Sequence, residues 1–287
     1  MSNIPLQKQL RSFILGSAAA LALASFLTGC GSSEATRQLT AEERYQLGMK
    51  AFKNEDYLAA IDEFKVVSLE FQGSGVADSA QFYMAECRYL REEYVLAAFE
   101  YDVLIRNMPT SPLVPRSRFR RATCFYELSP KSTLDQNYTR KAIDEYQAFL
   151  EYYPNDTLGH LAENRITDLN AKLAKKDYEN GITYMHLEYY RSAAYYFDLV
   201  LEKYHDTPYA EPALLKKAEA LFNRKKYPAA QEAIVRFLAK YPESSLKTDA
   251  VQLRDDIDSG IREEKKLNLK NQGPNKDAGG RSSQTGG

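Results

Sequence analysis

A repeated segment constrains the fold of this 287-residue chain more than any other feature. Four copies place an alanine three positions after a tyrosine, and 37 residues separate the tyrosines in the first two copies and in the last two. Most copies are followed by a turn phrase such as Tyr241-Pro242-Glu243-Ser244. Because proline stops a helix and Asn, Asp, Ser or Thr can cap the next one, each copy is predicted to be a helix pair. The tyrosines are Tyr57, Tyr94, Tyr190 and Tyr227, and a small residue stands nine positions before each, at Gly48, Ala85, Gly181 and Ala218.

This pattern resembles the tetratricopeptide repeat, whose period is about 34 residues. A fifth copy, residues 140–146, lacks the tyrosine in register. One such helix pair cannot bury its own apolar face, so neighbouring pairs stack. We therefore expect an all-α, tetratricopeptide-type superhelical solenoid of about five helix pairs plus a linker helix and a capping helix. The expected parts are pairs 1–3 in residues 41–156, the linker helix in 157–173, pairs 4 and 5 with the capping helix in 174–269, and a disordered tail in 270–287.

The first thirty residues differ in kind from the rest. Lys8 and Arg11 precede an uncharged, mainly apolar run at 13–27, which is too short for a confident membrane span and has the layout of a secretory signal. It ends in Leu27-Thr28-Gly29-Cys30, which resembles the bacterial lipobox. The resemblance implies a signal peptide at 1–29, a covalent lipid on Cys30 and a lipidated tether at 30–40. No aspartate follows Cys30 directly, which by the same resemblance favours the outer membrane and a periplasm-facing chain.

The chain offers little that could carry chemistry. Its three histidines are isolated from one another and from cysteine, and no nucleophile, phosphate-loop or zinc motif occurs. We expect no catalytic residue, no metal and no cofactor apart from the lipid on Cys30. A sequence pI of about 6.4 with interspersed charges also argues against a nucleic-acid partner. A non-enzymatic binding scaffold is the remaining class.

Aromatic side chains recur on the first helix of each pair, three positions before and four positions after the small residue. These offsets tend to line the concave face of tetratricopeptide solenoids, so the resulting concave aromatic stripe is predicted to bind an extended apolar or aromatic-rich peptide. Two arginines beside the stripe could meet a peptide carboxylate or acidic side chains. The residues leave open the alternative that these rings pack helix against helix and that the arginines are merely solvated. The peptide-binding candidates are Tyr45, Phe52, Phe82, Tyr89, Phe119, Tyr126, Arg116 and Arg120.

A second aromatic cluster surrounds one turn of the fourth pair. It holds more tyrosines than the core of a single pair requires, and tyrosine and arginine are enriched in interface cores. We therefore expect it to dock a partner protein. The docking candidates are Tyr189, Tyr190, Arg191, Tyr195 and Tyr196, with Tyr184 beside them.

Cys87 and Cys124 are also 37 residues apart, so they occupy the same position in neighbouring pairs. Equivalent points on packed helices lie about 8–10 Å apart, whereas a disulfide needs Cα atoms within roughly 7 Å. Two buried thiols are favoured over a bridge.

The lipobox followed by these repeats resembles the BamD family of outer-membrane assembly lipoproteins. The likeness is most specific at Arg165-Ile166-Thr167-Asp168-Leu169 and Tyr204-His205-Asp206-Thr207. It implies a part in inserting and folding outer-membrane proteins as a component of the β-barrel assembly machinery. By the same resemblance, the second half of the solenoid would dock on the periplasmic domains of the barrel-forming subunit, and the first half would meet unfolded substrate. The alternatives are a scaffold on the same fold for pilus assembly, or one for cell-envelope or cell-wall coordination.

Overall fold

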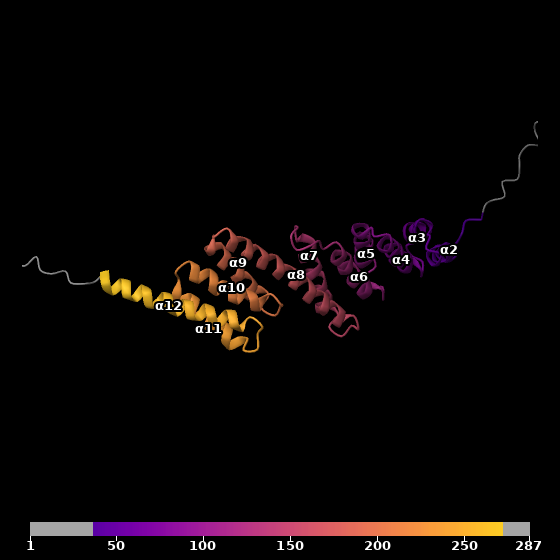
Figure 1. Ribbon diagram of the computed structural model, residues 1–287. Coiled ribbons are helices and arrows are strands. Elements are labelled where there is room, and N and C mark those ends of the chain that lie inside the picture. Colours follow the sequence, from indigo (N-terminus) through magenta and orange to yellow (C-terminus); the bar gives the residue numbers. More distant parts are fainter. Residues whose placement is uncertain (1–36, 272–287) are drawn as a thin grey trace, which may run out of the picture.

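A computed structural model describes residues 37–271, and this part of the chain is all helix and connecting turn, which confirms the predicted fold class. Figure 1 shows the helices following one another in chain order along an elongated molecule, from α2 at one end to α12 at the other. Each helix packs on the next one along the chain. The pairs are α2 (Ala41–Lys53) with α3 (Tyr57–Glu70), α4 (Ala77–Leu90) with α5 (Tyr94–Asn107), α6 (Val114–Glu127) with α7 (Asn137–Tyr152), α8 (Gly159–His186) with α9 (Tyr190–Lys203), and α10 (Ala210–Asn223) with α11 (Tyr227–Lys240), followed by α12 (Lys247–Asn271).

The small residues of the repeat make room for an aromatic ring of the partner helix. A Cβ atom added to Gly48 would lie 2.6 Å from the ring of Phe64, and one added to Gly181 would lie 2.5 Å from the ring of Phe197. Both rings are fully buried. The two helices of a pair therefore approach closely because the ring of the second lies against the bare backbone of the first.

The turns inside the pairs are tight and strained. In four of them a residue other than glycine adopts a left-handed backbone with φ near 60°: Glu55, Glu92, Glu188 and Lys225. Each lies two residues before the repeat tyrosine that begins the second helix. A left-handed conformation costs an L-residue about 1–2 kcal/mol, which the packing of the pair must offset.

The predicted linker helix at 157–173 is not a separate element. It continues without a break into the first helix of the fourth pair as α8, because no proline or glycine interrupts residues 160–180. The boundary at 173/174 nevertheless marks a change of core. Leu169 and Leu173 belong to the apolar cluster of pairs 2 and 3, whereas Ala174 belongs to that of pairs 4 and 5. One rigid helix thus joins the two halves of the solenoid.

The long turn between α6 and α7 is fixed to this helix. Lys172 donates from Nζ to the carbonyl oxygen and hydroxyl of Ser129, at 3.3 and 2.8 Å. One helical turn further along, Lys176 donates to the carbonyl oxygens of Ser132 and Leu134, at 3.2 and 2.8 Å. Two ammonium groups therefore satisfy backbone carbonyls of the turn, which holds the third pair against α8.

The last helix, α12, closes the solenoid. Ala250 and Ile257 face inward and are fully buried, whereas Asp255 and Asp256 on the other side are exposed. A polar outer face is what the terminal element of a solenoid needs for solubility. Among residues 37–271 no helix combines the length and apolar character that crossing a membrane requires.

Candidate functional site

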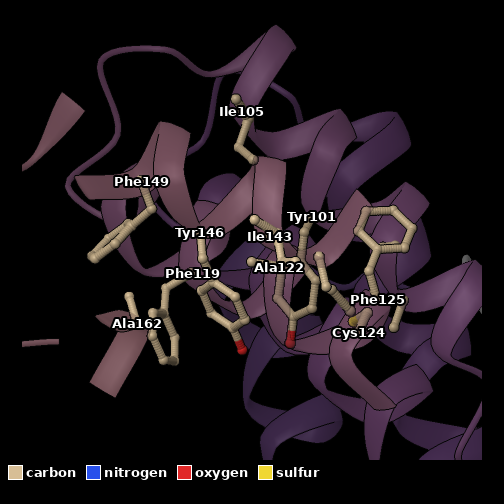
Figure 2. Packing of buried hydrophobic residues seen from close by; sticks show 14 of the residues in the cluster. Tyr101, Ile105, Phe119, Ala122, Cys124, Phe125, Ile143, Tyr146, Phe149 and Ala162 are labelled. Atoms are coloured by element: carbon tan, nitrogen blue, oxygen red, sulfur yellow. The ribbon is translucent and has the colours of Figure 1, made fainter. Parts of the chain in front are cut away.

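The concave aromatic stripe is largely an internal contact between helices. Phe82 is 2% exposed and Phe119 is 6% exposed, so neither can bind a peptide, and this part of the prediction is wrong. Figure 2 shows Phe119 enclosed by Tyr146, Phe149 and Ala162. The ring centroids of Tyr146 and Phe149 both lie 5.5 Å from that of Phe119, in tilted and edge-to-face arrangements. Phe119 therefore packs α6 against α7, the alternative that the sequence left open.

The remaining rings of the stripe are half-buried. Tyr45 and Phe52 of α2 both contact Tyr83, with ring centroids 6.5 and 5.3 Å away. Tyr83 is at a different repeat offset, which is why the sequence pattern did not single it out. Tyr89 and Tyr126 also keep part of their surface accessible. These four rings therefore offer a ligand only part of their surface.

Arginines from the following first helix cover three of the rings. The guanidinium carbon of Arg116 lies 5.1 Å from the ring centroid of Phe82, and that of Arg120 lies 3.9 Å from the centroid of Tyr89. Arg165 of α8, which the site prediction had not included, stands 4.1 Å from the centroid of Tyr126. These stacks are cation–π contacts between neighbouring pairs.

Arg120 is committed to an ion pair inside the protein. Its Nε and NH2 atoms donate to the two carboxylate oxygens of Glu86 at 2.6 and 2.7 Å, a bidentate geometry. The hydroxyl of Tyr101 donates to the same carboxylate, and burial first and Glu86 second raise the pKa of Tyr101 far above its ordinary range. Because Glu86 already satisfies this guanidinium, Arg120 is not available for a peptide carboxylate, contrary to the prediction.

Arg116 differs from Arg120. It is exposed, and no carboxylate of the described residues lies within 4.0 Å of it. Of the two arginine candidates, Arg116 alone keeps the free charge that the peptide-binding hypothesis requires.

The tyrosine cluster at the turn from α8 to α9 is exposed. Tyr189 is 63% exposed and Tyr195 is 60% exposed. Tyr196 stacks on Tyr184 with centroids 5.3 Å apart and planes 13° apart, and Tyr195 meets Tyr196 edge to face at 5.6 Å. Such large, mutually supported rings present an apolar surface at low entropic cost. The structure thus brings Tyr189, Tyr195 and Tyr196 together around Tyr184, which the sequence had placed beside them.

Two other members of the predicted docking group lie differently. Tyr190 is half-buried and packs against the core of pairs 4 and 5, as its repeat equivalents Tyr57 and Tyr94 do against the cores of their own pairs. It therefore holds α9 in place and offers a partner little surface. Arg191 is exposed, and no carboxylate of the described part of the chain lies within 4.0 Å of it.

Cys87 and Cys124 are free and buried, as expected. Burial raises the pKa of each thiol to about 12, so neither is ionised at neutral pH. Cys30 lies outside the described residues. Within residues 37–271 no group of three or more His, Cys, Asp or Glu side chains could hold a metal ion.

The fold and these surfaces define a tetratricopeptide-type helical scaffold, and residues 212–244 match the model of a tetratricopeptide repeat. Residues 37–221 match the model of a family described as outer membrane lipoprotein, YfiO. The chain belongs to this family, and the resemblance to BamD-type lipoproteins is thereby confirmed.

Two relatives carry the name outer membrane protein assembly factor BamD. The one from Caulobacter vibrioides is 24% identical over 207 residues, which are 70% of this chain and 68% of the relative. The one from Pasteurella multocida is 22% identical over 224 residues, 74% of this chain and 84% of the relative.

Solved tetratricopeptide structures are also similar. The TPR2AB domain of yeast Sti1 is 17% identical with a TM-score of 0.37, covering 76% of this chain and 98% of that domain. The P58(IPK) TPR domain is 14% identical with a TM-score of 0.39, covering 82% of this chain and 67% of that one. With TM-scores this low, these likenesses say nothing about partner or function.

Proposed function

We propose that this chain is a non-enzymatic scaffold of the β-barrel assembly machinery, which helps to insert and fold outer-membrane proteins. The observation that carries the proposal is the match of residues 37–221 to the outer membrane lipoprotein family. The two relatives named as outer membrane protein assembly factors support the same role.

The scaffold is anchored through a lipid on Cys30 to the periplasmic face of the outer membrane. The lipobox residues before Cys30 support this step, as does membership of a family of outer membrane lipoproteins. Several acyl chains together hold a protein firmly on a bilayer, because each buried methylene contributes about 0.8 kcal/mol. Helix α2 begins at Ala41, so the tether from Cys30 is eleven residues long and spans at most about 40 Å when extended.

The partner docks on the tyrosine cluster at the turn from α8 to α9. We take this partner to be the barrel-forming subunit, through its periplasmic domains. Tyr189 and Tyr195 supply exposed ring area that the core does not use, and the neighbouring Arg191 supplies an unpaired charge. Rings packed on one another lose little side-chain entropy on binding, which is a property of interface hot spots. The first half of the solenoid would then meet the unfolded outer-membrane protein.

The test is affinity purification of the tagged full-length chain from detergent-solubilised membranes, with mass spectrometry of the co-purifying proteins. The expected result is recovery of a barrel-forming outer-membrane protein that carries periplasmic domains. Reproducible recovery of pilus or cell-wall proteins in its place would refute the assembly role while leaving the scaffold intact.

A further inference from the structure

Helix α8 connects two cores in a different way from a short helix of the repeat. Its first part packs on the core of pairs 2 and 3, and its second part packs on that of pairs 4 and 5. Figure 1 shows α8 passing from one half of the molecule into the other. The first set of contacts is Ala162, Ile166, Leu169 and Leu173, and the second is Ala174, Tyr178, Ile182, Tyr184 and Met185. The two sets do not overlap along the helix, so each half of the molecule holds its own length of α8.

Helix α4 shows the other arrangement, in which one helix faces two cores along the same length. Ala80, Met84 and Cys87 belong to the core of pair 1. Phe82 and Ala85 lie between them in the sequence and belong to the core of pairs 2 and 3. Interleaved contacts lock neighbouring pairs together, because neither can turn about α4 without disturbing close-packed side chains of the other. Without such interleaving on α8, the two halves do not lock each other in this way.

Little else connects the two halves. Helices α6 and α7 pack on α8, but neither packs on α9 to a comparable extent. Among the described residues after α8, Tyr204 alone packs on the core of pairs 2 and 3 as well as on that of pairs 4 and 5. Apolar packing is not directional, so it does not by itself fix how far the first half is turned about the axis of α8.

The turn between α6 and α7 supplies directional contacts at this junction. Lys172, which donates to the turn, lies before the change of core at 173/174. Lys176 lies after the change of core and also donates to the turn. One helical turn further, the carboxylate of Glu179 accepts a hydrogen bond from the hydroxyl of Ser132 at 3.1 Å. The turn belongs to pair 3, so pair 3 holds α8 on both sides of the boundary between the cores.

The turn keeps its own shape through a buried polar network. Gln136 is fully buried and donates from Nε2 to the carbonyl oxygens of Lys131 and Leu134, at 2.8 and 3.0 Å. Its Oε1 atom accepts from the hydroxyl of Thr139 at 2.7 Å. The hydrogen bonds between the turn and α8, in contrast, are at most partly buried. Water can replace bonds of this kind at little net cost, so the turn can detach from α8 without unfolding.

We propose that the turn between α6 and α7 is a reversible brace. While its hydrogen bonds to α8 are made, they fix the angle between the two halves. When they break, the first half turns about the axis of α8 by sliding of the packed helices. The angle sets how the first half is presented relative to the tyrosine cluster at the far end of α8. The brace acts within the chain alone, so it does not depend on the proposed function.

The angle is measured as the distance distribution between two nitroxide labels, by double electron–electron resonance on the full-length protein in detergent. Asp62→Cys on α3 and Glu232→Cys on α11 place one label at an exposed position of each half, and the free cysteines that the structure describes are buried from the reagent. Lys172→Met combined with Lys176→Met removes the brace and keeps the apolar stems of both side chains. The distribution is expected to become at least about twofold broader, because sliding between the packed helices is no longer restrained.

Lys175→Met is the matched control, because Lys175 lies on the same helix and its ion pair, at 3.8 Å, is with Glu179 and not with the turn. It should leave the distribution as narrow as in the parent. A second label pair within the first half, Asp62→Cys with Asp144→Cys, should stay narrow in every variant, which shows that pair 3 is still folded. Equal widths in the parent and the double lysine variant would overturn the brace, as would broadening between the two labels of the first half.

Discussion

Replacing Gly181 by alanine is expected to weaken the contact between α8 and α9, although alanine is the better helix former. The new methyl group would lie 2.5 to 2.8 Å from three atoms of the Phe197 ring. That ring is fully buried, and because protein cores are close-packed it cannot move aside without displacing its neighbours. Overpacking of this kind costs about 1–3 kcal/mol, whereas the gain in helix propensity is about 1 kcal/mol. The expected net loss of unfolding free energy is therefore up to about 2 kcal/mol.

Gly159→Ala is the matched control in the same helix. There the added Cβ atom would lie 3.7 Å from Leu150, an ordinary van der Waals contact, so stability should stay level or rise slightly. The assay is urea denaturation followed by far-UV circular dichroism. Combining Gly181→Ala with Phe197→Leu should show a favourable coupling energy, because the smaller side chain leaves room for the methyl group. If the Gly181→Ala variant is as stable as the Gly159→Ala variant, the inferred close packing of the Phe197 ring on the backbone of α8 is refuted.

Two further predictions concern buried polar groups. Arg120→Met should cost about 3 kcal/mol of unfolding free energy, because it leaves the carboxylate of Glu86 buried without its partner. Arg116→Met should be nearly neutral, because Arg116 is exposed and has no such partner. The same urea denaturation assay compares the two variants. Thiol ionisation should lower the stability of the fold at alkaline pH. The pKa of Cys87 and of Cys124 is about 12 in the folded protein, against an ordinary value of 9.0. Between these two pH values the folded protein therefore binds more protons than the unfolded chain, and stability falls as pH rises. The thiols should not affect stability below pH 9, and they should lower it as pH rises toward 12. In a variant with both cysteines changed to alanine, the stability should decrease less over this pH range. Thermal midpoints measured across the range compare the two proteins.

Much of the fold was predictable because each pair repeats the same local pattern. The tyrosine spacing and the turn phrases place helix ends within a few residues of those in the structure, since proline and capping residues act locally. The side chains that pack against Gly48 and Gly181 were not predictable from the sequence. The structure places the rings of Phe64 and Phe197 against them. A spacing pattern shows which face a residue occupies but not which side chain reaches it.

The candidate sites were harder to predict for a related reason. Phe82 and Tyr89 share one face of α4, yet the first is buried and the second is half-exposed, because their cover comes from the next pair. The pairing of Arg120 with Glu86 joins residues 34 positions apart, close to one repeat length. A comparison of charged residues about one repeat length apart in the sequence would have indicated this ion pair. The hollow between α3 and α5 had no signal in the pattern, because Phe99, which lines it, occupies an ordinary outer position of α5.

The docking of a partner on the tyrosine cluster is tested most directly by co-purification of paired variants. The full-length chain with Tyr189→Ser and Tyr195→Ser is compared with Tyr152→Ser, which removes an equally exposed ring from α7 outside the cluster. We predict that the double variant stays folded and membrane-bound but recovers at least about tenfold less of the barrel-forming subunit, whereas Tyr152→Ser recovers as much as the parent. Equal recovery by all three proteins would contradict the account.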